Sequence, residues 1–117
     1  MSFIIALNDE TVWSPALDVG TAYTACAQAL GTTVGIDPGF TFIADDYVEV
    51  DPSSFRTFAA ALLARVSASP DHPVMIPLVN AVLAPSLVML ERAGYTVDIS
   101  ADPELVMKVE ALRTLPR

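Results

Sequence analysis

The stretch FTFIADDYVEVD, residues 40–51, carries the clearest strand pattern in the chain and decides the expected fold class. Apolar and polar side chains alternate on both sides of Asp45 and Asp46, which is the pattern of a strand buried on one face. Asp46 interrupts the apolar face. We therefore expect either a hairpin turn at the two aspartates or a carboxylate that points inward, and the cost of burying a lone carboxylate favours the turn.

A helix-start signal follows this stretch and recurs along the chain. Asp51-Pro52 supplies an N-cap side chain and a first-turn proline, and apolar residues at helical spacing come after it. Ser14-Pro15 and Asp102-Pro103 are equivalent signals for two more helices. We expect the first of these to end at Gly31, and we expect Gly20 inside it to mark a close contact with a neighbouring element.

The longest apolar run of the chain extends from Val74 to Leu90 and contains only two polar residues, Asn80 and Ser86. The preceding residues 71–73, Asp-His-Pro, are typical of a helix cap. The run predicts a central helix, buried in the core or partly buried by a second copy of the chain, with a kink or break at Pro85. It is slightly short for a membrane span, so we expect no membrane association.

Two shorter patterns complete the expected sheet. Residues Phe3 to Trp13 alternate around Asn8 and Asp9, which predicts a hairpin, and residues Tyr95 to Ile99 predict a short strand. We therefore expect one α+β domain over residues 1–117. Its small, mostly antiparallel sheet would pack against about four helices, with strands in the N-terminal hairpin and near residues 40–50 and 95–100.

The composition is typical of a compact intracellular domain. Of the 117 residues, 53% are hydrophobic and only 17% are charged, which is the opposite of a disordered composition. The single cysteine, Cys26, excludes an intramolecular disulfide and favours a cytoplasmic location. The first five residues lack a basic side chain and are too short an apolar run for a signal peptide.

The negative charge is confined to one part of the sequence. Eight acidic residues and no basic residue precede Arg56, whereas six acids and six bases follow from that position on, so that −8 and 0 sum to the formal charge of −8. Such a field repels nucleic-acid phosphates and anionic membranes, so we expect neither as a partner. It attracts a protein partner with a basic surface, although acidity also keeps a chain soluble.

The residues Asp45, Asp46, Tyr47 and Glu49 form the candidate partner-binding patch. Alternation places Asp45 and Glu49 on the same face as Tyr47, an aromatic residue of the kind that anchors protein interfaces. Two other interpretations remain open for the acids: a solvated face that ends in the helix cap at Asp51, or a site that holds Mg²⁺ or Ca²⁺.

No pattern in the sequence predicts a catalytic, cofactor or metal site. His72 is the only histidine and stands at an expected helix start, which makes a surface position the simplest interpretation. Cys26 lies on the apolar stripe of the first helix, so we expect a small core residue. The five glycines form neither a P-loop nor a dinucleotide-binding loop. An enzyme is therefore the less favoured class.

The chain resembles a family of small uncharacterised actinobacterial proteins over nearly its whole length. The similarity is carried by the following segments: Thr11-Val12-Trp13-Ser14-Pro15, Ala44-Asp45-Asp46, Val50-Asp51-Pro52 with Phe55, and Leu90-Glu91-Arg92-Ala93-Gly94. The resemblance implies a bacterial cytoplasmic origin and one intact domain. The family has no assigned activity, so the resemblance implies no catalytic residue.

Three classes of function are consistent with the sequence. The favoured one is a protein-interaction module, most concretely an immunity or inhibitor protein that covers a basic surface of its partner. The second is a homo-oligomeric structural or regulatory protein held together by the apolar segment Val74–Leu90. The third is a small enzyme or small-molecule-binding protein with a pocket between sheet and helices.

Overall fold

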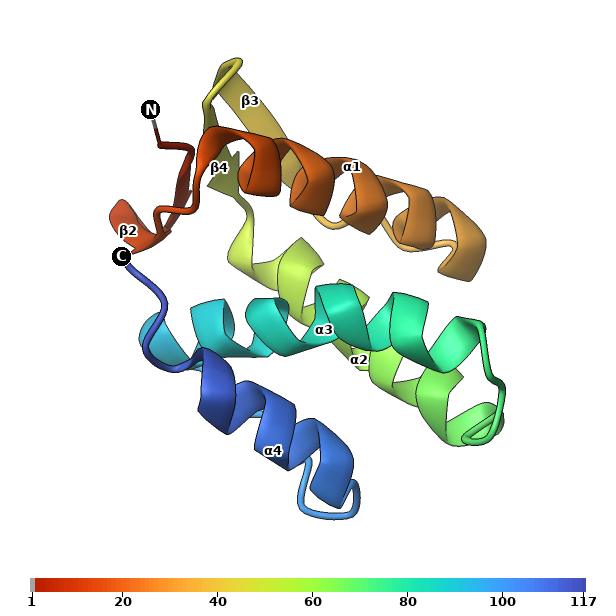
Figure 1. Cartoon of the computed structure of the whole chain (residues 1–117). Coiled ribbons are helices and arrows are strands. Elements are labelled where there is room, and N and C mark those ends of the chain that lie inside the picture. Colours follow the sequence, from red (N-terminus) through yellow and green to blue (C-terminus); the bar gives the residue numbers. More distant parts are fainter. Residues whose placement is uncertain (1) are drawn as a thin grey trace.

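The structure is a computed structural model that describes residues 2–117, and it consists of four strands and four helices (Figure 1). The α+β class and the small, mostly antiparallel sheet are confirmed. In chain order the elements are β1 (Ile4–Leu7), β2 (Glu10–Trp13), α1 (Leu17–Val34), β3 (Phe40–Ala44), β4 (Tyr47–Val50), α2 (Pro52–Ala68), α3 (Met75–Arg92) and α4 (Pro103–Leu112).

Two hairpins lie side by side in one sheet, with the strand order β2-β1-β4-β3. Each hairpin is antiparallel, and β1 joins β4 in parallel. The first hairpin turns at Asn8 and Asp9, whose φ angles of 54° and 63° are those of a tight turn that matches the strand twist. The second turns at Asp45 and Asp46, as the sequence predicts.

The expectation of a strand at residues 95–99 is wrong, because this segment pairs with no strand. Its apolar side chains are partly buried against the core on one side, which produces the alternation without a sheet. Side chains hold it instead: the Tyr95 ring lies 4.7 Å from the Arg56 guanidinium, and the Tyr95 hydroxyl accepts a hydrogen bond of 3.3 Å from Asn8 Nδ2. The backbone N–H of Ser100 then donates to Asp98 Oδ1, which turns the chain toward α4.

Helix α1 starts and ends later than the sequence indicates. Ser14-Pro15 does not start it, because the chain remains extended there and the Phe3 N–H donates to the Pro15 carbonyl at 2.8 Å. The helix also continues through Gly31 and ends at Gly35, which has a positive φ of 77°. At Gly31 a Cβ atom would approach the Ile36 carbonyl oxygen to 2.7 Å, so this glycine permits close contact between the helix and the segment that follows it.

Helix α3 is the central element, with α2 and α4 packed against it (Figure 1). Every residue from 82 to 90 is buried, and the helix continues through Pro85, so the expected break is absent. Length and composition alone would allow α3 to cross a membrane, and 61% of it is buried inside the protein. It is the buried core helix that the sequence predicts.

The sheet and the helices meet along a row of aromatic rings. Neighbouring ring centroids lie 5.3 to 6.2 Å apart, within the usual range for aromatic pairs. The row contains Trp13, Tyr23, Phe40, Phe55 and Phe58. It connects β2, α1, β3 and α2 in one core, and it leaves most of β3 outside that core.

Candidate functional site

The candidate partner-binding patch, Asp45, Asp46, Tyr47 and Glu49, lies on the second hairpin. Val48 and Val50 of the same strand are buried, so the side chains that alternate with them, those of Tyr47 and Glu49, belong to the outer face of the sheet. Asp45 and Glu49 are exposed, whereas Asp46 and Tyr47 are half-buried. The hairpin thus brings these residues together on the surface, with the two aspartates at its tip.

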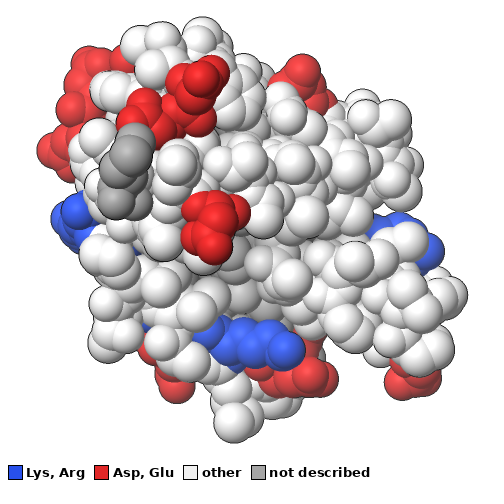
Figure 2. Space-filling view, turned by 45° about the horizontal axis from the view of Figure 1, so that its top comes forward, with Lys and Arg blue, Asp and Glu red and all other residues white. Residues whose placement is uncertain are grey.

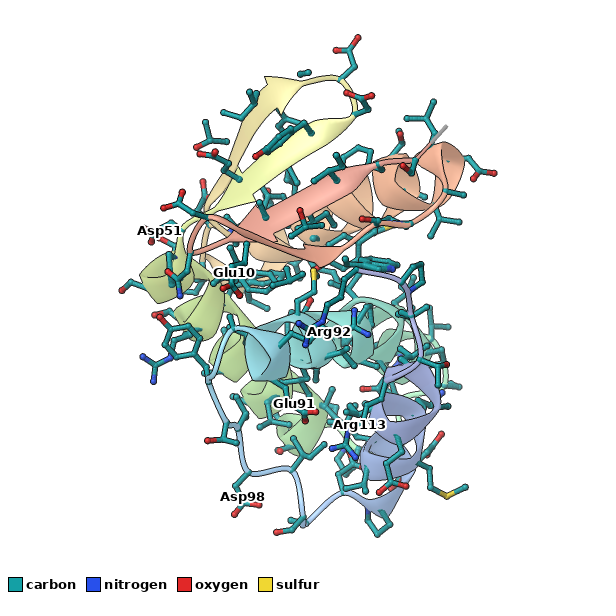
Figure 3. The ribbon with its side chains drawn as sticks, turned by 90° about the vertical axis from the view of Figure 1, so that its left-hand side faces the viewer. Glu10, Asp51, Glu91, Arg92, Asp98 and Arg113 are labelled. Atoms are coloured by element: carbon teal, nitrogen blue, oxygen red, sulfur yellow. The ribbon has the colours of Figure 1, made fainter. Side chains whose placement is uncertain are left out.

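Other acidic side chains extend this negative surface. Strand pairing places Glu10 beside Leu7 and Leu7 beside Val50, and Figure 3 shows Glu10 and Asp51 at the same end of the sheet. Figure 2, in which the top of Figure 1 comes forward, shows acidic groups over the upper part of the view, basic groups at its sides, and groups of both signs in its lower part. The upper part of this face therefore carries acidic groups with no basic group between them, whereas the lower part is mixed.

The acids of this surface do not form a metal centre. Among residues 2–117, no group of three or more His, Cys, Asp or Glu side chains could hold a metal ion. Asp51 is the N-cap of α2 and accepts a 2.8 Å hydrogen bond from the Ser54 N–H, and this bond lowers the pKa of the Asp51 carboxyl. Its carboxylate therefore stabilises the start of the helix, as the sequence predicts.

Strand β3 forms one edge of the sheet, and no other described segment pairs with its outer side. The Asp51 N–H donates to the Gly39 carbonyl at 2.9 Å, and bonds to a partner strand alternate along an antiparallel strand. The backbone groups of Phe40 and Phe42 therefore point away from β4. The Phe42 and Ile43 side chains are 45% and 56% exposed, so the edge is apolar as well as unpaired.

The opposite edge of the sheet, β2, is covered near its end. The Ser14 N–H donates to the Pro116 carbonyl at 2.9 Å, and the Arg92 guanidinium donates to the Val12 carbonyl at 2.8 Å. The C-terminal residues thus lie along the end of this edge. In the described part of the chain, β3 has no such covering contact along its outer side.

A second apolar surface is a groove of about 580 Å³ between α1 and α3. Val19 and Leu78 line it and are 47% and 52% exposed. Cys26 also lines it and is exposed, so the expectation of a core cysteine is wrong. The inward position belongs to Thr24, whose hydroxyl donates to the Gly20 carbonyl at 3.0 Å and is thereby accommodated in the core.

His72 contributes to the start of α3. Its Nδ1 atom accepts hydrogen bonds from the N–H groups of Val74 and Met75, at 3.2 and 3.1 Å. The side chain itself is exposed. The surface position at a helix start is confirmed, and the ring supplies the cap that Val74, the N-cap residue, lacks.

Ser86 and Asn80, the two polar residues of the apolar segment Val74–Leu90, differ in their hydrogen bonding. Ser86 donates to the Val82 carbonyl at 2.7 Å, so the Tyr23 hydroxyl must donate to Ser86 at 2.6 Å, and burial raises the pKa of Tyr23. Asn80 is only 2% exposed, yet its Oδ1 atom accepts no hydrogen bond within residues 2–117. An unsatisfied buried acceptor costs about 1–3 kcal/mol.

Asn80 lines a cavity that sequence reasoning missed. The cavity measures about 530 Å³ and lies between the end of α2, the first half of α3 and the segment that leads into α4. The sequence contains one signal for it, a polar residue in an otherwise apolar run. The cavity itself depends on three segments that only the fold brings together.

The whole chain was compared with protein families, curated proteins and solved structures. No curated protein and no solved structure matches it. A family model described as "Family of unknown function (DUF6086)" matches residues 1–117. The chain therefore belongs to this family of unknown function.

Proposed function

We propose that this protein is a protein-interaction module that binds an extended, basic segment of a partner along β3. The observation that carries the proposal is the unpaired apolar edge of the sheet, next to the acidic hairpin tip. Soluble proteins usually protect such edges with lysine, proline or a covering segment. Residues 40–44 contain neither lysine nor proline. Binding by strand addition would use the outward backbone groups of Phe40 and Phe42.

Charge favours a basic partner over a second copy at this edge. Asp37 precedes β3, and Asp45 and Asp46 follow it. Two copies paired antiparallel along β3 would place these acids of one chain near those of the other, in a pair of molecules that each carry −8. Like charges at paired strands are destabilising. Lysine or arginine side chains of a partner segment would instead meet carboxylates at both ends.

The more concrete form of the proposal is an immunity or inhibitor protein of the bacterial cytoplasm. Such a protein covers a basic surface of a toxin or enzyme and needs no catalytic residues of its own. The acidic hairpin would supply fast, salt-sensitive association, and the exposed Phe42 and Ile43 side chains would supply apolar contact. Tyr47, on the outer face of the sheet, would add an aromatic anchor.

A set of charge-matched peptides tests the proposal without knowledge of the partner. We expect an acetylated and amidated Lys-Val-Lys-Val-Lys-Val peptide to bind at least about tenfold more tightly than its Ser-Val counterpart, with an affinity that decreases as salt is added. The Glu-Val counterpart is expected not to bind. Isothermal titration calorimetry measures all three. Equal affinities for the Lys-Val and Ser-Val peptides would remove the acidic patch from the proposal.

Charge reversal on the hairpin is the matching test on the protein side. We expect Asp45→Lys combined with Glu49→Lys to weaken binding of the Lys-Val peptide by about tenfold or more, because two attractive charges become repulsive. Both side chains are exposed, so the fold should be retained. Glu110→Lys, at an exposed position on α4, changes the net charge by the same amount as each of these two substitutions. It therefore controls for the effect of net charge alone on peptide binding. A similar loss with the control would show that the hairpin has no special role.

One observation favours homo-oligomerisation as a second candidate. The α1–α3 groove is lined by apolar and small residues, and α1 carries a single charged residue, Asp18, so two acidic molecules could approach there. The second half of α3 is buried, which limits the exposed part of the Val74–Leu90 segment to its first half. Sedimentation velocity at rising concentration tests this: we expect association that Leu78→Lys abolishes, and a monomer at all concentrations would contradict it.

A further inference from the structure

The cavity next to α4 is separate from both apolar surfaces and has a mixed lining. Its walls include the apolar side chains of Leu63, Val66 and Ile99, and its polar lining includes Asn80 and three carboxylates. At about 530 Å³ it has the volume of a small-molecule site. Figure 3 shows Asp98, one of its residues, on the loop below the helices and away from the sheet.

Asn80 indicates what one end of a ligand would carry. Its side chain is almost completely buried, and Oδ1 has no hydrogen-bond donor within the described chain. Buried polar atoms are nearly always paired, so an unpaired acceptor on a residue that lines a cavity indicates a missing donor. A hydroxyl or N–H group of a ligand would provide that donor, and the surrounding apolar walls would bury the body of the molecule.

The carboxylates indicate what the other end would carry. They belong to Asp98, Asp102 and Glu104, and Lys108 lies 3.9 Å from Glu104. The bonds from Ser100 and Leu105 use only Oδ1 of Asp98 and Asp102, so these side chains retain an oxygen that could accept from a cation. The Ser100 N–H also lowers the pKa of Asp98, which keeps that carboxylate ionised.

We propose that this cavity binds a small organic amine: an ammonium group at the carboxylates, an apolar body, and a terminal hydroxyl or N–H donor to Asn80 Oδ1. Charge complementarity decides in favour of a cation, since three carboxylates are offset by one lysine. This site shares no residue with β3, so either proposal can be refuted without affecting the other.

Three probes of nearly equal size separate the parts of the proposal. Tyramine carries both the ammonium group and a phenolic donor, phenethylamine lacks the donor, and 3-(4-hydroxyphenyl)propionate replaces the ammonium group by a carboxylate. We expect tyramine to bind about fivefold more tightly than phenethylamine, the usual contribution of one hydrogen bond, and the carboxylate not to bind. Chemical-shift changes in a ¹⁵N-labelled protein measure affinity and location together.

Two variants assign the contacts. Asn80→Leu has nearly the same shape and is expected to remove the preference for tyramine over phenethylamine, while both amines still bind. It should also raise the urea midpoint of the free protein, because the unsatisfied acceptor is gone. If Asn80→Leu fails to fold, Asn80→Ala provides the same readout. Glu104→Gln is expected to weaken both amines about threefold, whereas Glu110→Gln on the same helix leaves them unchanged.

The outcomes are distinguishable. Tyramine binding with shifts at residues 98–104 and at Asn80, and loss of selectivity in Asn80→Leu, would support the site. Shifts at the hairpin instead would mean that amines respond only to the general negative field. No binding of either amine, or a tyramine preference that survives in Asn80→Leu, would overturn the proposal. None of these results depends on whether a peptide binds β3.

Discussion

Replacement of Arg92 by methionine is expected to lower the free energy of unfolding by about 3 kcal/mol, because hydrogen bonds to a charged donor contribute about 1.5–3 kcal/mol each. The guanidinium donates to three carbonyl oxygens, those of Val12, Arg113 and Leu115, at 2.8, 3.0 and 2.6 Å. It thereby joins the last helix turn of α3 to β2 and to the C-terminal segment. Figure 3 shows Arg92 pointing from α3 toward the sheet.

The neighbouring Arg113 is a matched control for this effect. It forms a two-bond ion pair with Glu91, at 3.1 Å, in which both side chains are about half exposed. Exposed pairs contribute about 0–1 kcal/mol, so Arg113→Met should change stability far less than Arg92→Met. Urea unfolding of both variants measures the difference. Equal losses would show that the carbonyl bonds of Arg92 do not hold the C-terminal segment.

Replacement of Gly20 by alanine is the second large expected effect, with a loss of about 2 kcal/mol despite the better helix propensity of alanine. A Cβ atom at Gly20 would overlap Cβ and the adjoining ring atoms of Phe3, which is 1% exposed and directly precedes β1. The ring cannot move outward without disturbing the core. The sequence predicts this close contact from the glycine alone, and the structure identifies Phe3 as its partner.

Two further substitutions separate overpacking from helix propensity. Ala25→Gly, at an exposed position in α1, should cost about 1 kcal/mol from propensity alone. Gly20→Ala in a Phe3→Ala background should be tolerated better than in the natural chain, since Cγ and Cδ1 of Phe3, two of the three atoms that the new methyl group would overlap, are then absent. Thermal unfolding of the set tests this. A Gly20→Ala variant more stable than the natural protein would disprove the contact.

Local signals account for the parts of the fold that the sequence predicts correctly. The turn at Asp45–Asp46 and the caps at Asp51 and Asp102 depend on neighbours within a few residues, and all are present. The strand at residues 95–99 could not be excluded locally, because one-sided burial produces the same alternation with or without a pairing strand. The start of α1 was misplaced because Pro15 pairs with Phe3, which lies far from it in sequence.

In the candidate surfaces, too, the features that depend on neighbouring residues were predictable and those that depend on distant contacts were not. Alternation alone places Tyr47 and Glu49 on one face of a strand, and the structure agrees. That β3 is an edge follows from the strand order, which the sequence does not contain. Cys26 is exposed and the nearby Thr24 is buried, because a threonine hydroxyl can bond within its own helix and polarity therefore does not decide burial here. The cavity lined by Asn80 could not be predicted, because it forms only where the end of α2, the first half of α3 and residues 98–104 come together.

Amide exchange at the sheet edge tests strand addition at β3 most directly. In the free protein we expect the N–H groups of Phe40 and Phe42 to exchange rapidly, while Thr41, which faces β4, is protected. Saturation with the Lys-Val-Lys-Val-Lys-Val peptide should slow exchange at Phe40 and Phe42 and leave Thr41 nearly unchanged. Protection that appears at other surfaces, or bound peptide with Phe40 and Phe42 still exchanging at their free rates, would contradict binding by strand addition.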